Sequence, residues 1–266
     1  MGRFEGKVAV VTGASRGQGR THAVRLAQEG ADVVIVDSCV GRATMPYEFP
    51  VEVDLRQTES LVTATGRHVL SRIIDDQDQL DVMVTDVIAD FGHIDIVSAD
   101  VGVGRGPTWD LTEAEWQDVL YINPAGAFQT IKAVAPSMIE AGRGGSIVLT
   151  SPIQPMLGST TVGRCCCRTS TSCVVRLMRT VAAELGPHGI RVNAVGSKPA
   201  CGASPADVSN AALFLSSDEA RYITGIALPI GMGRRLWPDP TEDAAVTPTC
   251  VLAGGECTHG SASTVH

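Results

Sequence analysis

Short apolar runs alternate with longer amphipathic stretches along most of this chain. The runs have the length of strands, and the stretches between them have helical periodicity. Strands are predicted at Val8–Thr12, Val33–Asp37, His68–Ile74, Ile94–Ser98, Ser146–Thr150, Arg191–Val195 and near Gly225–Pro229, and helices near Gly19–Glu29, Gln79–Phe91, Glu113–Ala141, Cys173–Leu185 and Ala206–Ser216. This alternation predicts the α/β class, with a doubly wound parallel sheet covered by helices on both faces.

The pattern stops before the end of the chain. Residues 238–266 are rich in Thr, Pro, Gly, Ser and Ala and have no apolar period, so a disordered tail is predicted there. A hydrophobic content of 44% in 266 residues favours one large core. We therefore expect a single domain over residues 1–237.

Charge and cysteine usage narrow the possible partners. The formal charge of -8 and the absence of any Lys or Arg run argue against nucleic acid. No apolar stretch has the length of a membrane span, and the N-terminus enters a strand directly instead of a signal peptide. A soluble, cytoplasmic protein is expected. Three of the eight cysteines are consecutive, Cys165 to Cys167, and no C-x-x-C pair occurs, which favours reduced thiols and no metal.

A glycine-rich segment follows the first predicted strand. Its candidate cofactor-binding residues are Gly13, Ser15, Arg16, Gly17, Gln18 and Gly19. Glycines between a strand and a helix allow a tight turn and close approach of the backbone to a pyrophosphate, which the helix N-terminus also favours. The segment predicts a Rossmann-type dinucleotide site; the alternative is a turn that serves the fold alone.

An aspartate ends the second predicted strand, about twenty residues after the glycines. There the carboxylate of Asp37, beside Ser38, can accept hydrogen bonds from the adenosine ribose hydroxyls and would repel a 2'-phosphate. This favours NAD over NADP, although Arg16 and Arg42 nearby could soften the preference. The alternative for Asp37 is a capping role at the strand end.

Several motifs occur in one order along the chain: TGASRGQG, Asp37, FGHIDIV, Tyr121-Ile122-Asn123, GGSIVLTS, ELGPHGIRVNAV and DEARYITG. With them, residues 1 to about 232 resemble the short-chain dehydrogenase/reductase family. The long segment between the second and third strands resembles the actinobacterial, carveol dehydrogenase-like branch, whose members hold NAD tightly. The resemblance implies an oxidoreductase of secondary alcohols or ketones, with a small hydrophobic, terpenoid-like substrate, and a homotetramer or dimer built on the helices near 113–141 and 173–185 and the last strand.

The same resemblance assigns residues to the adenosine side of the cofactor. An aspartate after the third strand contacts adenine in the family, and the match is Asp75, followed by Asp76. A helix cap is the equally weighted alternative. The family's Asn-Ala-Gly after the fourth strand reads Asp100-Val101-Gly102 here, which places a carboxylate near the cofactor, with Gly102 beside it.

The family's reaction requires a serine, a tyrosine and a lysine four residues after that tyrosine. The three tyrosines, at 47, 121 and 222, are followed four positions later by Val51, Ala125 and Ile226, so Tyr-x-x-x-Lys is absent. By the register of the last long helix, Cys167 replaces the tyrosine and Thr171 the lysine, while Ser151 is followed by Pro152 instead of pairing with a second serine. Asn123 matches the asparagine that orders a relay water in the family, although packing alone would also account for it.

Two further departures bear on activity. The predicted strand ending at Val195 is followed within about ten residues by the Ala206 helix, so the family's long lid is missing. Residues 154–172 lack the apolar period of their flanks, and a local frame change in the gene is one hypothesis for them. The sequence thus leaves an NAD-linked oxidoreductase, a non-catalytic NAD-binding homologue acting as subunit or sensor, and, least favoured, a structural partner without nucleotide.

Overall fold

The computed structural model describes residues 2–45, 48–100, 102–104, 108–150, 165–197 and 203–231. Within them, seven parallel strands form one sheet in the order β3-β2-β1-β4-β5-β6-β7. The predicted doubly wound parallel sheet is confirmed. No helix in the described part of the chain is long and apolar enough to span a bilayer. The predicted tail at 238–266 and the domain boundary at 237 lie outside the described residues.

The strands agree with the predicted ones to within two residues at each end. They are β1 (Val8–Thr12), β2 (Asp32–Asp37), β3 (Val69–Ile73), β4 (Ile96–Asp100), β5 (Gly145–Thr150), β6 (Ile190–Ser197) and β7 (Ala227–Ile230). All five residues of β1 are buried, as expected for a strand covered on both faces. The fourth strand runs two residues further than predicted, so Asp100 lies inside the sheet's carboxyl edge.

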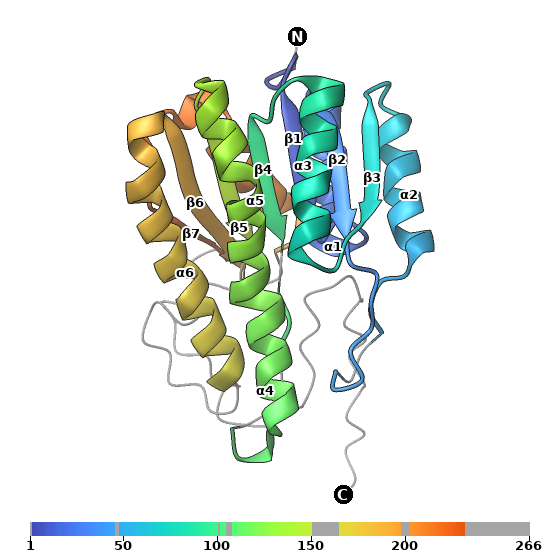
Figure 1. Cartoon of the computed structure of the whole chain (residues 1–266), viewed down its shortest axis with the longest axis vertical. Helices are drawn as coiled ribbons and strands as arrows, with labels where there is room; N and C mark the ends of the chain where they lie inside the picture. Colours follow the sequence, from blue (N-terminus) through green and yellow to red (C-terminus); the bar gives the residue numbers. More distant parts are fainter. Residues whose placement is uncertain are drawn as a thin grey trace, which may run out of the picture.

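Helices cover both faces of the sheet. They are α1 (Gly17–Gln28), α2 (Glu52–Thr63), α3 (Gln77–Phe91), α4 (Glu113–Leu120), α5 (Gly126–Ala141), α6 (Cys165–Leu185) and α7 (Pro205–Ser216). In Figure 1, α3, α5 and α6 lie in front of the sheet and α1 lies behind it, where it packs against α2 and α7. The largest core cluster joins β1, β4, β5 and β6 to the front helices, and a second cluster fills the space under α1 and α2.

Helix α2 was not predicted. No element is predicted from the sequence between Ser38 and Arg67, but twelve of these residues form this helix, with Leu55, Thr58 and Val62 buried. The spacing of these three residues is helical, with charged positions between them. The long connection therefore contains an irregular segment, described at residues 38–45 and 48–51, followed by an ordinary crossover helix.

The predicted single helix at Glu113–Ala141 is wrong in one respect. Residues Tyr121–Ala125 form a π-helical turn between α4 and α5, and Pro124 lies inside it. Proline has no N–H and its ring crowds the preceding turn, and a π turn is one way to accommodate it; at Pro136, by contrast, α5 continues as a regular α-helix. The π turn lies where α4, α5 and α6 approach one another.

Helix α6 begins at Cys165, eight residues before the predicted start at Cys173. The polar segment 165–172 is therefore helical, in spite of its weak apolar period, while residues 154–164 lie outside the described residues. The predicted short connection after β6 is confirmed, because β6 ends at Ser197 and α7 begins at Pro205.

Candidate cofactor site

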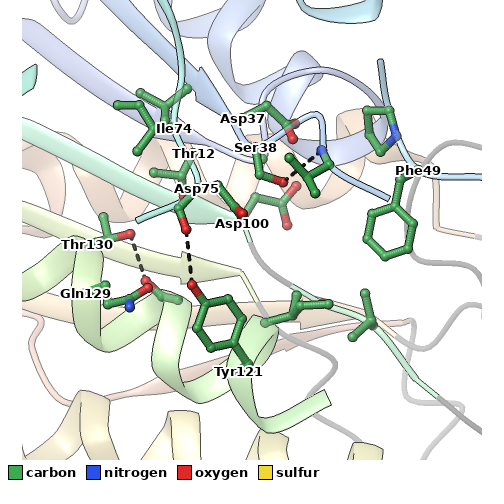
Figure 2. Close-up of a pocket in the computed structure, with 18 of the residues that line it drawn as sticks. Thr12, Asp37, Ser38, Phe49, Ile74, Asp75, Asp100, Tyr121, Gln129 and Thr130 are labelled. Carbon is green, nitrogen blue, oxygen red and sulfur yellow. Dashed lines mark hydrogen bonds between the residues drawn. The ribbon is translucent and has the colours of Figure 1, made fainter. Parts of the chain in front are cut away.

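A cavity lies at the carboxyl end of the sheet, where β1 and β4 are neighbours and the chain leaves them in opposite directions. Such a switch point is where open parallel sheets bind ligands. Residues from five strand ends, the loop after β2, the π turn and α5 line it. Among them are Thr12, Gly13, Arg16, Gln18, Asp37, Ser38, Arg42, Phe49, Ile74, Asp75, Asp76, Asp100, Gly102, Tyr121, Ile122, Gln129, Thr130 and Thr150. Figure 2 shows how ten of these residues surround the space.

The glycines of the loop after β1 have steric reasons to be glycine. Gly13 and Gly17 have φ of +65° and +57°, a region that other residues adopt at a cost. A Cβ on Gly13 would lie 2.1 Å from the carbonyl oxygen of Asp100, and one on Gly19 would lie 2.1 Å from that of Gly13. The loop therefore folds tightly onto β4, and its backbone is open to the cavity where the first turn of α1 begins.

Helix α2 fastens this loop from behind. The Arg16 guanidinium lies 2.6 Å from the Asp54 carboxylate and holds the pKa of that carboxyl below its ordinary value. Arg20 donates to the Thr58 hydroxyl, and Thr58 donates to the carbonyl of Ala14. The predicted role of Arg16 at the cofactor is thus combined with an ion pair to α2, which leaves its charge largely neutralised.

Asp37 lies at the end of β2, as predicted. Its carboxylate accepts hydrogen bonds from the backbone N–H groups of Ser15, at 3.0 Å, and Cys39, at 3.3 Å. These bonds hold the carboxylate beside the glycine loop. Asp37 therefore caps the end of the strand, as the alternative expected. Its carboxylate also lines the cavity, together with Ser38.

The two aspartates after β3 have different contacts. Asp76 caps α3 by accepting a hydrogen bond from the N–H of Gln79, at 2.8 Å. Asp75 receives the Arg42 guanidinium at 3.4 Å, and its carbonyl accepts a hydrogen bond from the Tyr121 hydroxyl at 3.1 Å (Figure 2). Both line the cavity; the helix cap is made by Asp76 instead of Asp75, and the adenine contact of Asp75 stays a prediction.

Arg42 connects the loop after β2 to the π turn. Its guanidinium lies 4.9 Å from the centre of the Tyr121 ring and pairs with Asp75 and, at 4.0 Å, with Asp118. A cation over an aromatic face is attracted by the ring's electrons. Since two carboxylates and the ring already surround Arg42, its charge is not free for a 2'-phosphate, which strengthens the predicted preference for NAD.

Asp100 ends β4, with Gly102 two residues further along. The backbone N–H of Gly19, in the first turn of α1, stabilises the ionised Asp100 carboxylate and lowers its pKa. Burial, and to a smaller extent the nearby Asp37 charge, raise the pKa of Asp100 to about 7 against the lowering effect of the Gly19 N–H. The predicted carboxylate near the cofactor is thus present at the helix end that favours anions.

Asn123 lies in the π turn and is only 2% exposed. Its side chain accepts from the N–H of Val103 at 2.8 Å, and donates to the Val103 carbonyl and to the Ser170 hydroxyl, both at 2.9 Å. The three bonds join the strand-four loop, the π turn and α6. Asn123 is therefore a structural clamp beside the cavity; the predicted relay role stays a prediction.

The remaining candidate catalytic residues are only partly described. Ser151 and the side chain of Cys167 lie outside the described residues. The backbone places Cys167 and Thr171 on α6 four residues apart, one helical turn. Thr171 is 1% exposed, and its hydroxyl has no hydrogen-bond partner among the described residues. A buried threonine at this position supplies no positive charge.

Three parts of the site were not foreseen from the sequence. His22 on α1 bonds through its ring nitrogens to Ser209, at 2.7 Å, and to Thr150, at 3.2 Å. Thr150 lines the cavity, as does Thr12, whose buried hydroxyl has no partner among the described residues. These contacts join positions far apart in the chain, and only Pro124 gave a local signal for the π turn.

Comparison with known proteins gives consistent matches. The family model described as short chain dehydrogenase matches residues 7–203. A short-chain type dehydrogenase/reductase of Mycolicibacterium smegmatis is 38% identical, over 88% of this chain and 99% of its own length. A (-)-trans-carveol dehydrogenase of Rhodococcus erythropolis is 34% identical, over 89% of this chain and 100% of its length. The crystal structure of carveol dehydrogenase from Mycobacterium avium in complex with NAD is 36% identical, with a TM-score of 0.81, and the match covers 86% of this chain and 98% of that one.

Proposed function

Since the chain belongs to the short-chain dehydrogenase/reductase family, as its motifs predicted, we propose that it binds NAD in this cavity and is an NAD-dependent oxidoreductase of secondary alcohols or ketones. The glycine cradle supports the proposal most directly. A Cβ on Gly13 or Gly19 would collide with backbone oxygen, so the loop keeps the close packing of a pyrophosphate-binding turn before a helix N-terminus. The Mycobacterium avium structure that carries NAD has the same fold.

The residues present would divide the cofactor between them. The loop from Gly13 to Gly19 would hold the pyrophosphate, with Gln18 in the first turn of α1. Asp37 and Ser38 would accept the ribose hydroxyls, and Asp75 and Asp76 would lie on the adenine side. Asp100 and Gly102 would line the cavity between the adenosine and nicotinamide halves of the cofactor. NAD supplies the chemistry of hydride transfer at its nicotinamide.

The step of this reaction for which the site is least complete is removal of the proton from the substrate hydroxyl. An oxidised alcohol must lose that proton to a base whose pKa is near the working pH. Cys167 and Ser151 are the candidates by position, and Thr171 offers no cation to lower the pKa of either. We therefore expect turnover to be slow, with small hydrophobic alcohols or ketones as substrates.

The buried Thr171 favours a second candidate function. Its hydroxyl has no partner among the described residues, and no cation takes the position of the family's lysine. The chain would then be an NAD-binding homologue without catalysis, which contributes a subunit or senses the NAD state. The two candidates share the whole cofactor half of the site and differ only at Cys167 and Thr171.

One sample can separate these candidates. The purified chain is denatured, released cofactor is identified by mass spectrometry, and turnover of a secondary-alcohol panel with an external acceptor is followed at the reduced-nicotinamide absorbance band. Bound NAD with turnover supports the oxidoreductase; bound NAD without turnover supports the non-catalytic homologue. Absence of binding in a folded sample would overturn both.

Restoring the missing motif gives a sharper test. The double variant Cys167→Tyr and Thr171→Lys places the family's base and cation four residues apart on α6, and we expect it to turn over alcohols at least tenfold faster than the parent chain. Thr171→Lys alone is the matched control, because it supplies the cation without the tyrosine. A folded, NAD-binding double variant with no gain would contradict the assigned register.

The expected location, oligomeric state and substrate of the chain follow from the same family resemblance. We propose a cytoplasmic homo-oligomer, a tetramer or dimer, with a small hydrophobic alcohol or ketone as its substrate. Exposed apolar side chains on α5, Phe128 at 51% and Ile139 at 37%, support self-association through that helix.

A further inference from the structure

The cavity proposed for the dinucleotide has an unusual charge distribution. Carboxyl groups outnumber cations among its lining residues, with Asp37, Glu48, Asp75, Asp76 and Asp100 against Arg16 and Arg42. Both arginines are already engaged by carboxylates, Arg16 by Asp54 and Arg42 by Asp75. A dinucleotide brings two negative phosphate charges into this space, so its affinity depends on which carboxyl groups are ionised.

Asp100 is the carboxyl group placed to matter most. Its side chain lines the cavity, the backbone N–H of Gly19 in the first turn of α1 stabilises its ionised form, and its carbonyl oxygen is where a Cβ on Gly13 would collide. It therefore lies against the loop that would hold the pyrophosphate. The amides of a helix N-terminus stabilise one nearby anion well, and here the side chain competes with the ligand for that stabilisation.

We propose that Asp100 sets the dinucleotide affinity of this chain, because the site binds the dinucleotide in the form in which Asp100 carries a proton. The inference rests on the proposed NAD site. Asparagine at this position, which the family pattern has, would offer the same hydrogen-bonding shape without a charge. Asp100 is thus an affinity-determining residue of this site.

The charged and ionisable groups around Asp100 indicate that Asp100 itself carries this proton. Burial, together with a smaller contribution from the Asp37 charge, raises the pKa of Asp100 to about 7. From α1, Gly19 and Gln18 are neutral, and His22, behind Thr150, has a pKa of about 4 and is neutral near pH 7. Thr150 on β5 and Gln129 and Thr130 on α5 carry no charge. Arg16, Arg42, Glu48, Asp75, Asp76 and Tyr121 complete the ionisable lining.

The sign of the effect follows from this pKa. A carboxyl group with a pKa of about 7 is mostly protonated at pH 6 and mostly ionised at pH 8. If only the protonated form binds, the apparent Kd rises as the binding-competent fraction falls, about tenfold between pH 6 and pH 8. Binding at pH 8 must then take up close to one proton.

Titration calorimetry of the purified chain with NAD tests this inference, after removal of any bound cofactor. Measurements at pH 6 and pH 8, each in two buffers of different ionisation enthalpy, give both the Kd and the number of protons taken up. We expect a Kd about tenfold higher at pH 8, with proton uptake at pH 8 only. In Asp100→Asn we expect the pH 6 affinity at both pH values and no proton uptake. Asp90→Asn, on the exposed side of α3, removes one charge far from the cavity and should behave as the parent chain.

Each result has a distinct meaning. A Kd equal at both pH values, without proton uptake, would overturn the role of Asp100 and leave the NAD proposal standing. An Asp100→Asn variant that keeps the pH dependence would also overturn it, because another group would carry the proton. No NAD binding at pH 6 by the folded parent chain would overturn the proposed function and this inference together. If Asp100→Asn fails to fold, absence of proton uptake by the parent chain at pH 8 would still overturn the role of Asp100.

Discussion

At the scale of single residues, the shape of the cavity depends on the missing side chain of Gly19 as much as on the side chains that line it. Gly19 has no Cβ, and the carbonyl oxygen of Gly13 occupies the space that a Cβ would need. The first turn of α1 can therefore lie directly over the loop. Ser15 and Asp37 then fix the loop to β2 through a backbone-to-carboxylate hydrogen bond. The absence of a Cβ at Gly19 thus allows the loop from Gly13 to Gly19 to adopt this shape.

The variant Gly19→Ala should lose this packing. Its Cβ would lie 2.1 Å from a backbone oxygen, so the loop or the helix must move. We expect NAD affinity to fall at least tenfold and the free energy of unfolding to fall by about 1 to 3 kcal/mol. Calorimetric NAD titration and urea unfolding measure the two quantities. Gly41→Ala is the matched control, because nothing lies within 4 Å of its added Cβ; equal behaviour of the two variants would contradict the steric argument.

A second residue-scale prediction concerns His22, which joins α1 to α7 and β5. Burial lowers its pKa to about 4, below the ordinary value near 6.5. As the pH falls from about 6.5 towards 4, the unfolded chain takes up a proton that the folded chain refuses, so stability is lost in that window, by roughly 3 kcal/mol at most. Above pH 6.5 this residue makes no pH-dependent contribution.

The variant His22→Gln isolates the effect, since an amide can still bond to Ser209 and Thr150 but does not titrate. We expect the stability difference between the parent chain and this variant to narrow by about 2 kcal/mol between pH 7.5 and pH 5. Urea unfolding at both pH values measures it. The exposed His188, replaced by glutamine, is the control and should leave the parent's pH profile unchanged. A parallel shift of the parent and His22→Gln curves would show that His22 is protonated in the fold.

The residues of the site differ in how far the sequence could predict them. The glycines and Asp37 were predictable, because their roles depend on backbone conformation and position within one strand-turn-helix unit. Arg42 and His22 were not, because their partners, Tyr121 and Ser209, lie 79 and 187 positions away. No local pattern records which distant side chains a fold brings together.

At the scale of elements, the loop of residues 38–51 is tied to the π turn and α4. Arg42 lies over the Tyr121 ring and between two carboxylates, and the Thr44 hydroxyl donates to Asp118. Beneath these contacts Met45 packs into a small apolar cluster. The polar contacts therefore fasten a loop that also lines the cavity, through Arg42 and Phe49.

Replacing Arg42 by methionine should loosen this loop while keeping most of the side chain's apolar volume. The cation over Tyr121 and the partly exposed ion pairs together contribute about 1 to 2 kcal/mol, enough for roughly tenfold faster local opening. Hydrogen exchange of peptides spanning 38–51 measures the opening, and NAD titration measures the expected several-fold loss of affinity. Arg56→Met, on the exposed face of α2, should change neither. Unchanged exchange in Arg42→Met would mean that the apolar cluster alone holds the loop.

The elements themselves were predictable in proportion to their local signals. Strands buried on both faces, such as β1, form continuous apolar runs that few other structures produce. The π turn was missed because the apolar period continues across it, and only Pro124 marks the break. Helix α2 was missed because Leu55, Thr58 and Val62 cover one narrow face of an otherwise charged segment.

At the scale of the whole molecule, α5, one of the helices in front of the sheet in Figure 1, carries exposed apolar side chains. On α5, Phe128 and Ile139 are exposed and lie eleven residues apart, which is close to three full turns, so they share one face of the helix. Large apolar side chains on one exposed helix face are typical of subunit interfaces. We expect the chain to form its oligomer across this face.

The variant Phe128→Glu should disrupt that assembly. In a two-fold interface each copy contributes the same surface, so one substitution places two unpaired carboxylates in the contact. Sedimentation velocity should then show smaller species than the parent chain at the same concentration, with the fold retained by circular dichroism. Val82→Glu is the matched control, since Val82 on α3 is 61% exposed but stands alone as an apolar residue outside the predicted interface. If Phe128→Glu sediments as the parent chain does, the oligomer, whatever its size, does not use this face of α5, and the two apolar side chains must serve another contact.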